Sequence, residues 1–151
     1  METKKNKNYD LIKADSGITL EWQKREKTLI ISGEGRCELG EVRGDIVTEG
    51  RAQVTVQTVG YAWSKGASTL TVDTISFSAG SWDNSTLTVQ TVSDWAASFG
   101  ASTMTAETVG GYAVSHDNSS LTVETVGGNA WSWDNSTNTV HGMKIQAETN
   151  E

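Results

Sequence analysis

The chain has 151 residues, enough for one domain with a modest core, and only 36% of them are hydrophobic. Its net charge of −7 is uneven, because residues 1–51 balance ten Lys/Arg with ten Asp/Glu, whereas residues 52–142 carry seven acids and a single base, Lys65. Residues 52–142 thus lack the basic patch that a phosphate backbone requires, and we expect no nucleic-acid partner. The single cysteine, Cys37, excludes a disulfide within the chain and a cysteine-based metal site.

The N-terminal sequence METKKNKNYD is basic and polar and lacks the apolar segment of a secretory signal. No apolar run approaches the roughly 20 residues that a membrane-spanning helix needs. We therefore expect no membrane partner and a location in the cytoplasm or in a virion.

The first fifty residues contain three strand-like segments, DLIKA (10–14), ITLEWQ (18–23) and TLIISGEG (28–35). Ser16-Gly17 and the charged turn KREK (24–27) separate them, which predicts a short β-meander. Since the end of a stacked sheet is an open edge that needs covering, residues 1–51 are predicted to be an N-terminal β cap. The glycine-punctuated stretch 35–50 is compatible with irregular first coils.

From residue 52 the chain repeats itself about every 17 residues. Units such as STLTVQTVSDWAASFGA and SSLTVETVGGNAWSWDN begin at Ser68, Ser85, Ser102, Ser119 and, truncated, Ser136, and a looser unit begins at Ala52. A short fixed period rich in Thr, Val and Trp, with Gly or Asp-Asn at fixed points, predicts stacked β-coils. The predicted fold is all-β, a single-stranded β-solenoid over residues 52–142, with 143–151 as a C-terminal tail.

The first strand of each unit has alternating apolar residues, which predicts two inward columns. The columns are Leu70, Leu87, Met104, Leu121 and Val72, Val89, Ala106, Val123, Val140. The Thr residues between them are then expected to point outward.

The second strand of each unit carries two invariant small columns, Ala62, Ala79, Ala96, Ala113, Ala130 and Ser64, Ser81, Ser98, Ser115, Ser132. Small residues suit the inside of a thin solenoid, which directs the aromatic side chains outward. The opposite arrangement would bury Lys65 and place Trp beside Gly80 inside. The favoured arrangement gives an outer face of binding candidates: Tyr61, Trp63, Trp82, Trp95, Phe99, Tyr112, Trp131 and Trp133.

Three partial resemblances accompany these repeats. Units such as NAWSWDNST and STLTV resemble low-complexity solenoid repeats of phage tail spike and fibre proteins and of bacterial surface proteins. LGEVRGDIVTEGRAQV (39–54) is similar to bactofilins, which are cytoplasmic β-helical polymers, and SHDNSSLTVETVGG (115–128) resembles bacterial ice-nucleation repeats. These resemblances imply a β-solenoid architecture and transfer no catalytic residue.

Two surfaces are functional candidates. Exposed Trp and Tyr stack on sugars or anchor protein interfaces, so we expect a homo-oligomer or a glycan or protein partner at the aromatic strand. The T-x-T rows, such as Thr86/Thr88 and Thr103/Thr105, form a grid that favours ice binding as the alternative function, although Thr is also an ordinary strand former. A bactofilin-like polymer is the further alternative.

We expect no enzyme, cofactor or metal site. His116 and His141 occupy different repeat positions without a fixed partner, and nothing marks Asp94 and Glu107 as a catalytic carboxylate pair. Asp117 and Asp134 lie on adjacent rungs, where a shared cation competes with an ordinary Asx turn, and we favour the turn.

Overall fold

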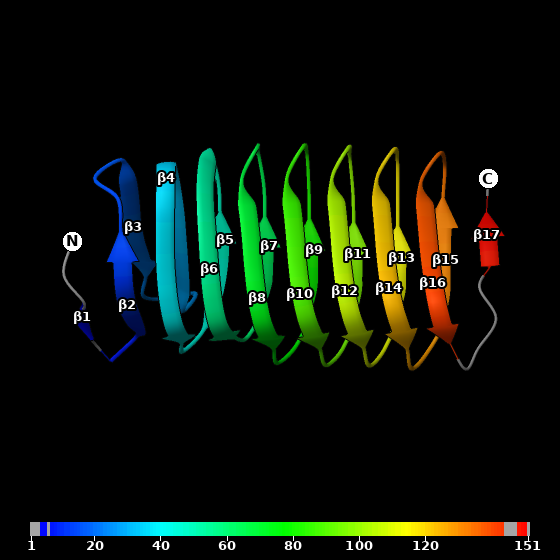
Figure 1. The fold of residues 1–151 in the computed structure, drawn as a ribbon, viewed down its shortest axis with the longest axis horizontal. Helices are drawn as coiled ribbons and strands as arrows, with labels where there is room; N and C mark the ends of the chain where they lie inside the picture. The colour runs from blue at the N-terminus through cyan, green and yellow to red at the C-terminus, as the bar shows by residue number, and fades with distance from the viewer. Residues whose placement is uncertain (1–3, 6, 144–147, 151) are drawn as a thin grey trace.

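The computed structural model describes residues 4–5, 7–143 and 148–150, with side chains over 7–141. It is an all-β parallel solenoid of about seven turns, with coils about 17 residues long. Each coil contributes a long strand to one sheet and a short strand to the other, and the coils stack along the long axis of the molecule (Figure 1). The described residues contain no helix long and apolar enough to cross a membrane.

The long strands form sheet A and the short strands form sheet B. Sheet A contains β1 (Lys4–Lys5), β2 (Tyr9–Ala14), the second part of β4 (Thr28–Val42), β6 (Arg51–Val59), β8 (Thr69–Ile75), β10 (Thr86–Val92), β12 (Thr103–Val109), β14 (Ser120–Val126) and β16 (Thr137–Met143). Sheet B contains β3 (Ile18–Gln23), the first part of β4, β5 (Asp45–Thr48), β7 (Ala62–Ser64), β9 (Ala79–Ser81), β11 (Ala96–Ser98), β13 (Ala113–Ser115), β15 (Ala130–Trp133) and β17 (Glu148–Asn150).

The repeat strands pair in parallel and in register, as predicted from the 17-residue period. Leu87 pairs with Leu70 on one side and Met104 on the other, and Ala96 pairs with Ala79 and Ala113. Identical positions therefore form straight columns along the solenoid axis, with about 4.8 Å between successive residues of a column. This register turns the repeat pattern of the sequence into continuous faces on the molecule.

The N-terminal end differs from the repeats in strand direction. β2 and β3 both pair antiparallel with β4, which passes from sheet B to sheet A near Gly33. β4 also pairs in parallel with β5 and β6, so parallel stacking extends N-terminally to Thr28, within the segment predicted to be a cap. At the other end of the chain, β17 adds to β15 in parallel, while residues 144–147 and 151 of the predicted tail lie outside the described residues.

The interior has the predicted inward columns. Leu70, Val72, Ala79 and Ser81 are at most 2% exposed, whereas Thr71 is exposed. A third apolar column, absent from the prediction, completes the core with Val59, Ile75, Val92, Val109 and Val126. In β8 the neighbouring Asp73 and Thr74 both face outward, which breaks the two-residue alternation and returns Ile75 to the core.

Candidate functional site: an aromatic face on sheet B

The outer face of sheet B carries every aromatic residue predicted for the site. The fixed Ala and Ser columns occupy the inward positions, so the alternating positions point away from the core. We name this surface, together with Phe77 and His116, the aromatic face. Its members are Tyr61, Trp63, Phe77, Trp82, Trp95, Phe99, Tyr112, His116, Trp131 and Trp133.

Serine hydroxyl groups form hydrogen bonds between the inward side of each short strand and a corner of the next coil. Ser85 Oγ lies 3.0 Å from Ser64 Oγ and 2.9 Å from the Ser64 carbonyl oxygen, and Ser102 repeats this contact with Ser81. The serine columns are therefore fixed by buried hydrogen bonds between successive coils as well as by size. This network holds the backbone from which the aromatic side chains project.

Four rings stack along one edge of the aromatic face. Trp82 and Phe99 have centroids 5.0 Å apart, Phe99 and His116 also 5.0 Å, and His116 and Trp133 5.8 Å, with interplanar angles of 11°, 9° and 5°. The Lys65 ammonium lies 6.0 Å from the Trp82 ring and extends this ladder with a cation. Because the spacing matches the distance between coils, each ring covers the face of the next.

A second group of rings gathers at the N-terminal end of the face. Trp63 contacts Trp82 and Trp95 at centroid distances of 5.1 and 5.7 Å, and Tyr61 stacks on Phe77 at 5.1 Å. Gly80 makes this crowding feasible, because a Cβ there would lie 2.5 Å from the Trp63 ring and 2.7 Å from the Trp82 ring. The two rings thus lie over Gly80 and bury it.

Four rings remain substantially open to solvent. The exposed fractions are 36% for Tyr61, 52% for Phe77, 48% for Tyr112 and 40% for Trp133. Trp63, Lys65, Trp82 and Asp83 also line a recess of about 470 Å³ at the edge of the ladder. Sequence reasoning missed Phe77 because the equivalent positions are Asp94, Gly111 and Gly128, so no aromatic column marks it.

Charge is excluded from the central part of this surface. From β9 to β15 the outward positions carry no Lys, Arg, Asp or Glu among the described residues: they are Ser78, Gly80, Trp82, Trp95, Ala97, Phe99, Tyr112, Val114, His116, Asn129, Trp131 and Trp133. The opposite outer face, on sheet A, carries Thr columns and the acids Asp73, Glu107 and Glu124. The solenoid therefore has one apolar and one polar, acidic face.

The corner aspartates act as turn residues. Asp83, Asp117 and Asp134 each have a φ of 61°, the left-handed conformation that Gly66 and Gly100 adopt at equivalent corners. The Gly66 and Gly100 amides donate to the Oδ2 atoms of Asp83 and Asp117 at 3.2 and 3.1 Å. These side chains therefore bond the corner of the preceding coil, 17 residues away, and not their own local backbone as in the predicted Asx turn. The described residues contain no group of three or more potential metal ligands.

The one cysteine lies in the core. Cys37 is 1% exposed, and burial, together with the nearby Asp15 and Glu38 carboxylates, raises the pKa of its thiol to about 11. At neutral pH the thiol is therefore protonated and unreactive. Comparison with protein-family models, with curated proteins and with solved structures finds no match for this chain.

Proposed function

We propose that the protein is a non-enzymatic structural protein that associates with a second copy of itself through the aromatic face. The observation that carries this proposal is the uncharged, ring-covered outer surface of β9 to β15 on a chain with a net charge of −7. Exposed rings on an otherwise polar protein usually mark a partner surface. The resemblance to tail spike and fibre repeats favours a component of a phage or bacterial particle.

The orientation of the rings supports a protein partner over a glycan. Sugar rings stack on open aromatic faces, but within the ladder Trp82, Phe99 and His116 cover one another. The ring edges that stay exposed suit packing against another apolar surface. The aromatic face of a second copy is such a surface. The recess beside Trp82 and Lys65 is the place where a single sugar ring would fit, and glycan binding is therefore the competing outcome.

The size of the aromatic face limits the affinity. Its five rungs and three columns extend roughly 20 Å along the axis and roughly 13 Å across, which is small beside the ~800 Å² per partner of a standard interface. We therefore expect a dissociation constant of order micromolar.

Substitution of the rings tests this proposal. We expect the triple variant Trp82→Ser, Trp95→Ser, Trp133→Ser to sediment as a monomer at concentrations where the unchanged chain is dimeric or larger. The matched control replaces Thr71, Thr88 and Thr105 by Ser on the opposite face and should retain the native association. Circular dichroism checks that each variant is folded, and if the triple variant is not, Phe77→Ser with Tyr112→Ser removes exposed rings outside the ladder.

Three results would contradict the proposal. Association that persists in the folded ring variants would exclude the aromatic face as the interface. A monomeric chain that binds glycans on an array, and loses that binding in the triple variant, would establish the glycan alternative. Filaments in electron micrographs that survive the ring substitutions would instead favour the bactofilin-like polymer.

Ice binding is the second candidate, and the register of sheet A favours it. Thr71, Thr88, Thr105 and Thr122 pair directly across four strands and form a regular column. The same surface is hollowed, however, by a recess of about 440 Å³ whose lining includes Asp73, Glu107 and Glu124. A charged, concave surface is poorly matched to a flat crystal lattice.

We therefore expect the unchanged chain to produce no thermal hysteresis in freezing-point measurements. Thr88→Tyr with Thr105→Tyr should make no difference to this result. Hysteresis in the unchanged chain that disappears in the double variant would rank ice binding above self-association.

A further inference from the structure

A cationic pocket lies at the N-terminal end of the solenoid, away from the aromatic face. Three separate segments form it: the residues preceding β2, the end of β3 with the turn that joins it to β4, and the turn between β4 and β5. The cavity has a volume of about 550 Å³, in the range of small-molecule sites. Its lining residues are Lys7, Asn8, Trp22, Lys24, Lys27 and Arg43.

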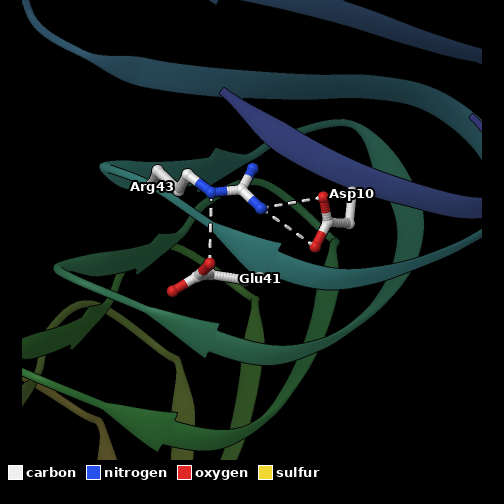
Figure 2. A network of polar contacts seen from close by, with 3 residues as sticks. All are labelled: Asp10, Glu41 and Arg43. Carbon is white, nitrogen blue, oxygen red and sulfur yellow. Dashed lines mark hydrogen bonds and ion pairs between the residues drawn. The ribbon is translucent and has the colours of Figure 1, made fainter. Parts of the chain in front are cut away.

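None of the described residues that line this pocket is acidic, although the chain as a whole is acidic. Arg43 is oriented by two carboxylates, with Nη2 3.0 Å from Asp10 Oδ1 and Nε 3.1 Å from Glu41 Oε1 (Figure 2). Among the described side chains, the three lysines form no ion pair. The four cations of the lining outnumber the two carboxylates that contact Arg43, and Glu26, in the same turn as Lys24 and Lys27, is not part of the lining.

The backbone holds the two turns of the pocket together. Lys27 has a φ of 51°, an uncommon left-handed value for a side-chain-bearing residue, and its carbonyl oxygen accepts the Asp45 amide at 2.9 Å. At Gly44 a Cβ would lie 2.1 Å from that carbonyl oxygen and 3.1 Å from the Trp22 indole. Only glycine permits this approach, which fixes the two turns and the indole beside each other.

The half-buried Trp22 supplies an apolar wall. Its ring packs on the end of the core and lies 6.3 Å from the Tyr9 ring, so the indole is anchored on the protein side. The flexible lysine side chains around this fixed indole can adjust to the position of a charged group on a ligand, while a ring of the ligand contacts the indole.

We propose that this pocket binds a small organic ligand that carries a phosphate or sulfate group. Several ammonium groups satisfy the anionic oxygens of that group, and a sugar-sized ring bonded to it packs against Trp22. The pocket has room for one such group, whereas the acidic repeats that follow would repel an extended polyanion. The proposal is independent of the aromatic face.

Calorimetric titration of the full chain tests this site with glucose 6-phosphate, inorganic phosphate and glucose. We expect glucose 6-phosphate to bind, inorganic phosphate to bind more weakly, and glucose not to bind. The double variant Lys7→Gln, Lys24→Gln should weaken glucose 6-phosphate binding by about tenfold or more, since two charge-assisted contacts are lost. The control Lys13→Gln, Arg51→Gln removes the same charge from exposed residues outside the pocket and should change binding less than about twofold.

Nuclear magnetic resonance gives a second readout at the Trp22 indole N–H, whose signal should shift with glucose 6-phosphate. No binding of either phosphate compound would overturn the proposal, as would an equal loss in the control variant, which would indicate unspecific charge attraction. Equal affinity for inorganic phosphate and glucose 6-phosphate, with no shift at Trp22, would overturn the role of the ring.

Discussion

Val123→Asp is expected to unfold the repeat region, whereas Thr122→Asp is expected to leave it folded. Val123 is 0% exposed in the centre of β14, between Ala106 and Val140 in the same inward column. A carboxylate there would be buried without a partner, at a cost of several kcal/mol against a typical net stability of ~5–15 kcal/mol. Chemical or thermal denaturation followed by circular dichroism measures the difference.

Thr122 is the matched control because it is adjacent in the strand and points to the opposite side. Its outward position faces the polar surface of sheet A, so an aspartate stays hydrated and should cost no more than about 1 kcal/mol. Equal destabilisation by the two substitutions would contradict the inward and outward assignment of this strand.

The fold was predictable because the repeat fixes the period and the columns fix the faces. Leu87 and Val89 alternate with Thr, and identical positions recur every 17 residues, so strand, register and inward side follow together. The third core column was missed since Asp73 and Thr74 both face outward, a local bend that a two-residue period does not represent. The start of parallel stacking at Thr28 was missed because β4 also serves the antiparallel strands of the N-terminal end.

The site was predictable as a face but not as an arrangement of rings. The outward orientation of the aromatic side chains follows from the invariant Ala and Ser columns, which the structure places in the core. The stacked ladder depends on side-chain torsions and on His116 lying between Phe99 and Trp133, which column composition does not encode. The cationic pocket was missed altogether, because Lys7, Lys24 and Arg43 are far apart in the sequence and meet only at the corner of the folded chain.

The second large effect concerns solvent access to the aromatic face. If a second copy covers this face, rings that are 36–52% exposed in the single chain become protected on association. The most informative rings are Tyr61, Phe77, Tyr112 and Trp133, which are the exposed members of the face. Ile12, also 36% exposed but on β2 of sheet A, serves as an internal control outside the face.

Hydroxyl-radical footprinting over a dilution series measures this protection directly. Between about 1 and about 100 μM protein, a range that brackets a micromolar dissociation constant, modification of the four exposed rings should fall several-fold while Ile12 stays unchanged. The protection should follow the same concentration dependence as the sedimentation coefficient. Association of the chain with unchanged modification of Tyr61, Phe77, Tyr112 and Trp133 would contradict self-association through the aromatic face.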